Sequence, residues 1–332
     1  MKTRRGIDAE VYEVLAAAYA REGMDVDQRE VGAYRTKTVH AGEFLYVSCY
    51  PLISAGANRR QKEQMKNLNP DGMKRDARIK YARYNNKRRM LAFEQLVHAN
   101  FGRGDFHVTL TYESGDWSIR ENLPDRTRDD AKRELTNWLA RVKRLLKRHG
   151  ADMSRFRWLR TTVTKRGDGE HCDRHHHHVL LGGVPEELRS EIERLWTFGY
   201  CNADRLQPNE KGVSEIAQYI ARQEGSANGA HAAFDRSWSG SRNLKRPAVA
   251  TSDRRISRRR VGKIAADVRA DGIEIFEAVY PGYRAVEPPE VMLSDFCAGA
   301  YIWAKMRRIE REGSNHDGTG VSGRNSAAFA AD

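Results

Sequence analysis

Four consecutive histidines, residues 175–178, run directly into the apolar segment Val179–Leu181. Alternate residues of a β-strand share a face. Val179 and Leu181 belong on the buried face, and His175 and His177 share that face with them. The same parity places His176 and His178 side by side on the opposite face, where two imidazoles can bind one metal ion. A loose metal-binding tract, or histidines in a merely polar strand, would give the same run.

A second pattern that could do chemistry lies about forty residues further on, where Tyr219 precedes Arg222 by three residues. On a helix these two side chains share a face. A phenol beside a permanent cation can attack a phosphodiester, because the cation stabilises both the phenolate and the pentavalent phosphate. Taken alone, Tyr219 is better explained as a packing residue of an amphipathic helix. The strand of histidines about forty residues earlier favours a catalytic role for Tyr219 instead.

The surrounding sequence predicts an alternation of strands and helices. Strict apolar–polar alternation marks Phe106–Tyr112 as a half-buried strand, and helical spacing of apolar residues marks Arg128–Arg148 as a helix. The further elements are predicted strands at Phe156–Thr164, His175–Leu181 and Tyr200–Leu206, and predicted helices at Pro185–Trp196 and Lys211–Glu224.

The first six of these elements follow the order β-α-β-β-α-β, which is the split βαβ arrangement of ferredoxin-like folds. We therefore expect an α+β domain whose antiparallel sheet carries helices on one face and leaves the other face free for a ligand. On the first strand, the parity that buries Phe106 and Val108 leaves Thr109 and Thr111 on the free face. That face is therefore expected to be polar around the histidines.

The chain is strongly basic: 58 Lys and Arg residues against 45 Asp and Glu leave a formal net charge of +13. Such a surplus attracts polyanions, of which nucleic acid is the commonest in a cell. Basic residues concentrate in 57–90 and again in Arg254–Arg260, so both segments are expected to hold a phosphate backbone. The alternative is a chain that is merely basic, with its charge runs solvated.

Composition and motifs argue against several classes of protein. No apolar run approaches the roughly 18–20 residues of a membrane span, so no membrane partner is expected. The four cysteines lie far apart without a C-x-x-C pair, which is typical of reduced thiols in a cytoplasm. The sequence has no Gly-x-x-x-x-Gly-Lys-Ser/Thr loop, so no built-in helicase is expected.

Four motifs in order resemble those of the HUH endonucleases, specifically the rolling-circle replication initiators of small phages and plasmids, and among them the filamentous-phage gene II and ORF2-type replication proteins. The motifs are Phe106–Tyr112, His176–His178 as the His-hydrophobic-His pattern, Tyr219–Arg222 as the tyrosine motif, and Ser241–Pro247. The resemblance covers roughly Asn100–Pro247. Each motif alone is weak, but the four in this order on a βαββαβ pattern are specific.

The resemblance implies that the protein nicks one strand of single-stranded or extruded origin DNA. Tyr219 would attack the scissile phosphate and stay linked to the 5′ end, leaving a free 3′-OH, and the strand would later be rejoined. Mg²⁺ or Mn²⁺ would be held by His176 and His178. A host polymerase and helicase are the implied protein partners, in the cytoplasm of a bacterial cell. The implied nucleic-acid contacts are Thr109, Thr111, Arg242, Asn243, Lys245 and Arg246.

Two departures from the family pattern affect the site. The family usually has lysine three residues after the tyrosine; here Arg222 keeps the charge but cannot act as an acid or base, so its role is expected to be electrostatic. Many relatives also carry a glutamate on the preceding strand as a third metal ligand, where this chain has Thr164. Glu170, or the neighbouring His171, is the candidate to replace it from the connecting loop.

These features divide the chain into four expected parts: a basic, partly helical N-terminal region (1–95), the HUH endonuclease domain (96–250), a C-terminal accessory region (251–312) and a disordered tail (313–332). The first and third parts are expected to be basic extensions of the endonuclease domain.

Other interpretations remain open. The same chemistry serves single-tyrosine transposases and plasmid relaxases, and a non-catalytic, metal-dependent nucleic-acid-binding regulator would explain the basicity and the histidines without Tyr219. Tyr301, close to Lys305 on a probable helix, is a possible second nucleophile, although a packing role is preferred.

Overall fold

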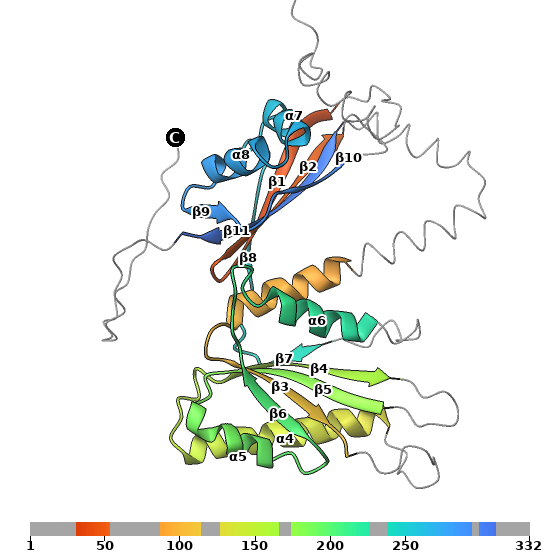
Figure 1. Cartoon of the computed structure of the whole chain (residues 1–332), viewed down its shortest axis with the longest axis vertical. Coiled ribbons are helices and arrows are strands. Elements are labelled where there is room, and N and C mark those ends of the chain that lie inside the picture. The colour runs from red at the N-terminus through yellow and green to blue at the C-terminus, as the bar shows by residue number, and fades with distance from the viewer. Residues whose placement is uncertain are drawn as a thin grey trace, which may run out of the picture.

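The computed structural model describes residues 31–53, 87–113, 127–165, 174–225, 238–293 and 299–309. These residues form an α+β structure with two antiparallel sheets that lie one above the other along the long axis of the molecule (Figure 1). None of the helices in the described ranges is long and apolar enough to cross a membrane. The predicted helical pattern in the first thirty residues, most of the basic segment 57–90 and the tail at 313–332 lie outside these ranges.

The lower sheet of Figure 1 contains the histidine strand at its centre. Its five strands lie in the order β6-β3-β5-β4-β7, and all neighbours are antiparallel. The strands are β3 (Phe106–Thr111), β4 (Arg157–Lys165), β5 (Arg174–Gly182), β6 (Cys201–Arg205) and β7 (Ser239–Gly240). Each of the four longer strands matches a predicted strand to within a few residues.

The helix α4 (Arg128–Arg148) has the bounds that its sequence predicts. Thr127 begins it: the Thr127 hydroxyl accepts a hydrogen bond from the backbone N–H of Asp130, whose carboxylate accepts one from the backbone N–H of Thr127. A stripe of apolar residues that includes Trp138 and Val142 buries this helix against one face of the sheet. The short helices η2 (Glu186–Leu188) and α5 (Arg189–Arg194) cover the same face.

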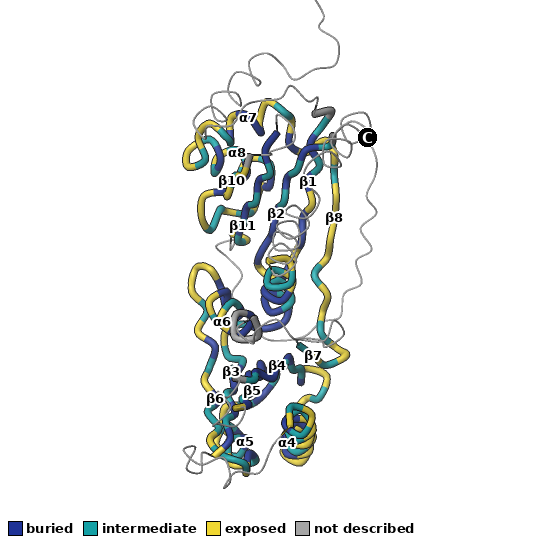
Figure 2. The backbone as a smooth tube through the Cα atoms, turned by 90° about the vertical axis from the view of Figure 1, so that its right-hand side faces the viewer, coloured by how far each residue is buried: buried dark blue, intermediate teal, exposed yellow. Residues whose placement is uncertain are grey.

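The opposite face of this sheet is also covered by helices, so the prediction of helices on one face alone was wrong. Helical residues 87–100 and α6 (Ser214–Gly225) lie there, between the two sheets (Figures 1 and 2). The cause is visible in the strands, because Leu159 and Leu180 point to this second face and are buried with Ile220 and other apolar residues of the two helices. Apolar side chains on both faces of a sheet require cover on both.

The upper sheet combines the two ends of the described chain. Its strands lie in the order β10-β11-β2-β1-β8, and β9 pairs with β11. They are β1 (Val31–Ala41), β2 (Phe44–Ile53), β8 (Ala248–Ser252), β9 (Tyr283–Ala285), β10 (Glu290–Leu293) and β11 (Ala300–Arg308). Two helices, α7 (Arg258–Ala266) and α8 (Asp271–Val279), share a buried core with this sheet.

This sheet differs from the expected division into separate regions 1–95 and 251–312. β1 and β2 form a hairpin whose turn contains Gly42 at φ 62°, a conformation that favours glycine. A side chain at Gly42 would also collide with the backbone carbonyl oxygen of His98. β2 then pairs with β11, and β1 with β8, so segments from both ends of the described part of the chain form one sheet.

Candidate functional site

The four histidines occupy β5 with the parity that the sequence predicts. His177 is buried on the side of α4, where its ring nitrogens lie 2.9 Å from Tyr112 Oη and 3.0 Å from Thr162 Oγ1. His176 and His178 lie on the other face, with ring centroids 5.2 Å apart. The structure therefore separates a histidine that supports the core from a pair that faces α6.

Tyr219 meets this pair. Its ring lies 5.4 Å from the ring of His178, at 75° to it. Tyr219 is 47% exposed, whereas its helix neighbours Ala217 and Ile220 are buried in the core shared with the sheet. The apolar side of α6 thus fixes the helix, and the phenol is left accessible next to the histidines.

A buried polar network anchors α6 at its first turn. Ser214, the first residue of the helix, donates a hydrogen bond of 2.6 Å to Glu94 from residues 87–100. Lys305 from β11 donates to the same carboxylate at 2.9 Å and also contacts the Ser214 hydroxyl. The side chains of Lys305 and Glu94 are only 11% and 8% exposed. The upper sheet therefore contacts the helix that carries Tyr219.

His98 extends this network. The backbone N–H of Val213 can only donate, so it donates to Nε2 of His98, at 3.2 Å. In the neutral ring Nδ1 then carries the proton and donates to Tyr46 Oη at 2.6 Å, which leaves the Tyr46 hydroxyl to donate to Glu94 at 3.0 Å. Burial, then Lys305, lowers the pKa of His98 to about 3, so the ring is neutral at pH 7.

A third histidine, His107, belongs to the same face and was missed in the sequence. It lies in β3, with its ring stacked on His178 at 5.3 Å and its Nε2 3.2 Å from Nδ1 of His178. Strand parity could have identified it, because His107, Thr109 and Thr111 are two residues apart and therefore lie on the same face. His107 is a lone histidine between the apolar residues Phe106 and Val108, so the sequence around it does not indicate a metal site.

His178 contacts His107 through Nδ1, which leaves Nε2 as the nitrogen that can face a metal ion. Nε2 of His178 is buried and has no hydrogen-bond partner among the described residues. If Nδ1 of His178 donates to His107, then Nε2 keeps a free lone pair, which is the state a metal ligand needs. Burial, then His107 and His176, lowers the pKa of His178 to about 3, and burial also lowers the pKa values of His107 and His176. These rings are therefore neutral at pH 7.

The donors for a metal ion are two imidazoles. Within the described ranges, no three His, Cys, Asp or Glu side chains come together as a metal-binding group. Thr164, which stands where a third metal ligand was sought, contacts Nδ1 of His175 at 2.9 Å. Glu170 and His171 lie outside the described residues. The orphaned, neutral nitrogen of His178 fits a metal, with oxygen ligands needed from elsewhere.

The chain matches none of the family models, curated proteins or solved structures with which it was compared. Its functional assignment therefore rests on the geometry of this site.

Thr109 and Thr111 lie where the sequence predicts. In the register of β3 with β5, Thr109 is opposite His178 and Thr111 is opposite His176. The Thr111 hydroxyl donates to the carbonyl oxygen of Tyr200 at 3.3 Å. The polar face expected around the histidines is therefore present, although helices cover part of it.

The predicted nucleic-acid contacts in Ser241–Pro247 lie elsewhere. Asn243 donates to the carbonyl oxygen of Phe156 at 2.9 Å, and Asn100 holds the backbone of Lys245 by hydrogen bonds of 2.7 and 2.9 Å. Asn243 and Lys245 line a cleft that includes neither Tyr219 nor the paired histidines. Arg242 and Arg246 are exposed on the same segment.

The two remaining predicted residues, Arg222 and Tyr301, lie in α6 and β11. Arg222 follows Tyr219 in α6, and its side chain is outside the described part of the chain. Tyr301 lies in β11, so the helix expected there was wrong; the segment alternates buried and half-buried residues, as a strand does. Its ring stacks on Trp303 with centroids 6.2 Å apart, in the upper sheet, whereas His176 and His178 belong to the lower sheet.

Proposed function

We propose that this protein is a DNA nicking-and-joining endonuclease of the HUH class, acting as a rolling-circle replication initiator. One observation carries the proposal: the exposed phenol of Tyr219 lies against His178, next to His176. A phenol beside neutral imidazoles on a polar sheet face suits metal-assisted attack on a phosphodiester better than packing.

The arrangement of the lower sheet supports the same assignment. Its elements follow the order β3-α4-β4-β5-α5-β6, and its strands lie in the order β6-β3-β5-β4. Both orders are those expected of a split βαβ, ferredoxin-like sheet, and they support the proposal. In this chain a second helical layer is added over the histidine face.

The reaction is a transesterification. The Tyr219 oxygen forms a bond to the scissile phosphorus, and the bond from phosphorus to the 3′ oxygen breaks. The phenol proton ends on that 3′ oxygen, which leaves a 3′-OH and a 5′-phosphotyrosine. Because one phosphodiester replaces another, the same site can rejoin the strand by the reverse step.

His176 and His178 would hold the divalent ion, Mg²⁺ or Mn²⁺. When bound, such an ion polarises a phosphate oxygen and stabilises the charge that develops on it. The chain's own part is to keep both imidazoles neutral by burial and to orient His178 through His107. Arg222 would add a positive charge one helical turn after Tyr219, without taking or giving a proton.

The expected partner is origin DNA, and the excess of basic residues supports a polyanion as ligand. A free 3′-OH is the substrate of a DNA polymerase, so a host polymerase and helicase would act next, in a bacterial cytoplasm. Thr109, Thr111 and the exposed residues Arg242 and Arg246 are the remaining proposed contacts.

A denaturing gel tests this function. Wild type, Tyr219→Phe and Tyr200→Phe are incubated with a labelled single-stranded DNA library, with Mn²⁺ or with EDTA. Tyr200 is 67% exposed and serves as the matched control. We expect a metal-dependent covalent band in wild type and Tyr200→Phe only. A band that persists in Tyr219→Phe contradicts the assigned nucleophile. Metal-dependent binding without any covalent band supports the regulator instead.

A further inference from the structure

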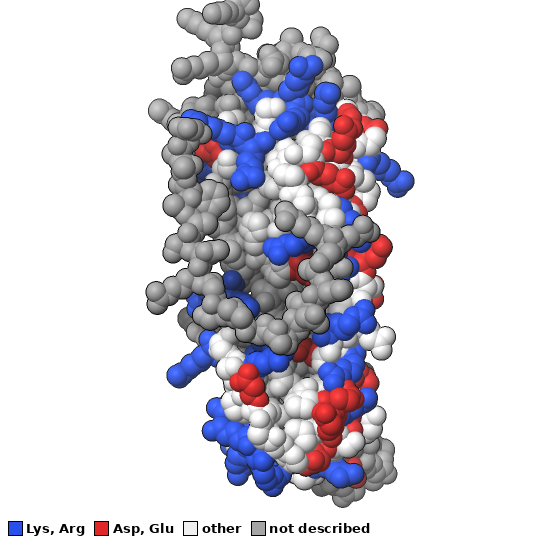
Figure 3. All heavy atoms as spheres, turned by 90° about the vertical axis from the view of Figure 1, so that its left-hand side faces the viewer, with Lys and Arg blue, Asp and Glu red and all other residues white. Residues whose placement is uncertain are grey.

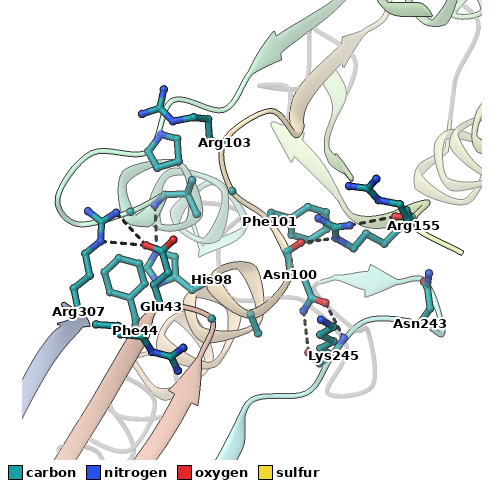
Figure 4. Close-up of a pocket in the computed structure, with 18 of the residues that line it drawn as sticks. Glu43, Phe44, His98, Asn100, Phe101, Arg103, Arg155, Asn243, Lys245 and Arg307 are labelled. Atoms are coloured by element: carbon teal, nitrogen blue, oxygen red, sulfur yellow. Dashed lines mark hydrogen bonds and ion pairs between the residues drawn. The ribbon is translucent and has the colours of Figure 1, made fainter. Parts of the chain in front are cut away.

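A cleft of about 860 Å³ lies where the two sheets approach each other (Figure 4). Its walls come from the β1–β2 turn, the end of the helical segment 87–100, the residues before β4, the segment that follows β7, and the end of β11. Both sheets therefore contribute to it. Neither paired histidine belongs to its lining, so it is separate from the site described above.

The lining of the cleft is strongly basic. The described lining contains one acidic residue, Glu43, and six cationic residues. These are Arg103, Arg155, Arg157, Lys245, Arg307 and Arg308. Only part of this charge is neutralised: Arg157 pairs with Asp105 at 2.8 Å, and Arg307 pairs with Glu43 at 3.0 Å. A cleft lined by one sign of charge concentrates the field and attracts counter-charge.

Three of these cations are available to a ligand. Arg103, Arg155 and Lys245 are exposed, and their side chains make no hydrogen bond or salt bridge within the described ranges, although Arg155 interacts electrostatically with Asp152. Figure 3, which shows the face at the left of Figure 1, has Lys and Arg side chains near its upper end and again at its lower left, while most Asp and Glu side chains lie along its right-hand edge. The available cations make phosphate the expected ligand chemistry.

The aromatic residues of the cleft do not offer stacking surfaces for bases. Phe44 and Phe101 are 4% and 5% exposed. The guanidinium of Arg157 lies over Phe101 at 5.5 Å, and that of Arg307 lies over Phe44 at 5.8 Å, so these rings orient the arginines. The cleft is therefore built to contact a phosphate backbone without reading bases.

The cleft adjoins the helix of the nucleophile. Gly212 and Val213 line it, and α6 begins at the next residue. At 1.5 Å per residue, Tyr219 lies about 9 Å further along the helix direction than Val213. A volume of this size is typical of pockets for small ligands, so it accepts a few nucleotides of a single strand and excludes a duplex.

We propose that this cleft binds the phosphates of single-stranded DNA a few nucleotides away from the phosphate that Tyr219 attacks. The proposal rests on the proposed function for the identity of the ligand. It also assigns a role to the upper sheet, because Arg307 and Arg308 complete the cleft from β11. Without that sheet the cleft would lose one wall.

Salt-dependent binding tests the proposal. Fluorescence anisotropy with labelled oligo(dT) compares wild type with Arg103→Gln/Arg155→Gln, in the full-length chain. The matched control is Lys143→Gln/Lys147→Gln, which removes the same charge from the exposed side of α4, across the sheet from the cleft. Removing two phosphate contacts should reduce the slope of log K against log salt by about 1.4 and weaken binding about 25-fold near 0.1 M salt. The control should keep the wild-type slope.

Equal slopes in the cleft variant and the control would overturn the proposal. A labelled hairpin duplex forms the second arm: a loss of duplex affinity as large as the loss for oligo(dT) would overturn the single-strand assignment. These binding measurements need no cleavage of the DNA. If the cleft variant shows the reduced salt slope but wild type forms no covalent adduct, the nuclease function is rejected and the binding cleft is retained.

Discussion

The rings of His178 and Tyr219 lie 5.4 Å apart, although one belongs to the central strand of a sheet and the other to a helix that packs on it. Burial holds His178 neutral, and the exposure of Tyr219 leaves its oxygen accessible. Their contact is the feature from which the proposed chemistry follows.

Replacing Tyr219 by phenylalanine should separate chemistry from stability. The side chain is half-exposed and its ring contact with His178 is retained in phenylalanine. We expect the free energy of unfolding, measured by urea denaturation, to change by no more than about 0.5 kcal/mol. A larger loss would show that the hydroxyl has a structural role, and the missing covalent band could then reflect misfolding.

His107 should act as a positioning residue for the metal ligand His178. His107→Ala removes the hydrogen-bond partner of Nδ1 of His178, so Mn²⁺ affinity, measured by isothermal titration calorimetry, should fall about 10–100-fold. His107→Gln supplies an amide oxygen that can accept the same proton, and it should restore part of the affinity. The surface residue His149, changed to glutamine, is the control. Equal affinity in His107→Ala and the control would remove His107 from the site.

Breaking the buried pair of Lys305 and Glu94 should destabilise the protein. Lys305→Met leaves the Glu94 carboxylate buried without its cation, which typically costs about 3–5 kcal/mol. Although burial, the largest single influence, raises the pKa of Glu94, Lys305 and Ser214 lower it below its ordinary value, so it is charged at pH 7.

The added change Glu94→Gln should recover much of that loss, since the unpaired charge is then gone. Lys87→Met is the matched control, because Lys87 forms an exposed ion pair with Glu290 and should cost less than about 1 kcal/mol. Urea denaturation of the four proteins measures the effects. Similar values for Lys305→Met and Lys87→Met would contradict a stabilising role for the buried pair.

The stability of the protein should fall as the pH drops below about 6.5. His98 has a pKa of about 3 in the folded chain, so between pH 6.5 and 3 the unfolded chain binds a proton there that the folded chain does not. Stability therefore rises with pH in this window, by up to about 1.4 kcal/mol per pH unit for each such histidine. His177 and His178, whose pKa values are also about 3, contribute in the same direction.

Urea denaturation at several pH values between 4.5 and 7 measures this slope. His98→Gln cannot take up a proton, so its slope should be smaller than that of wild type by up to about 1.4 kcal/mol per pH unit. His149→Gln, which removes a histidine at an exposed position, is the control. An unchanged slope in His98→Gln would mean that His98 is protonated in the folded protein.

The local pattern of the sequence determined the elements of the lower sheet and the faces of its side chains. Helical spacing of apolar residues placed α4 at Arg128–Arg148, and strand parity placed His176 and His178 on the face opposite α4. Both features depend on residues a few positions apart, because the periods of helices and strands are short. The association of Tyr219 with the histidines was inferred from the order of motifs and is now supported by a ring contact.

Long-range pairing was decided only by the tertiary structure. β2 carries β-branched and aromatic residues, yet nothing near it in the sequence indicates that it pairs with β11, more than two hundred residues away. Parity showed that Leu180 faces away from α4 but could not identify the helices that cover it. The position of His107 against His178, the network that joins Lys305 to Glu94, and the basic cleft all depend on which elements meet. Side-chain periodicity specifies which face of an element is buried, whereas the partner that buries it depends on the free energy of the whole packed chain.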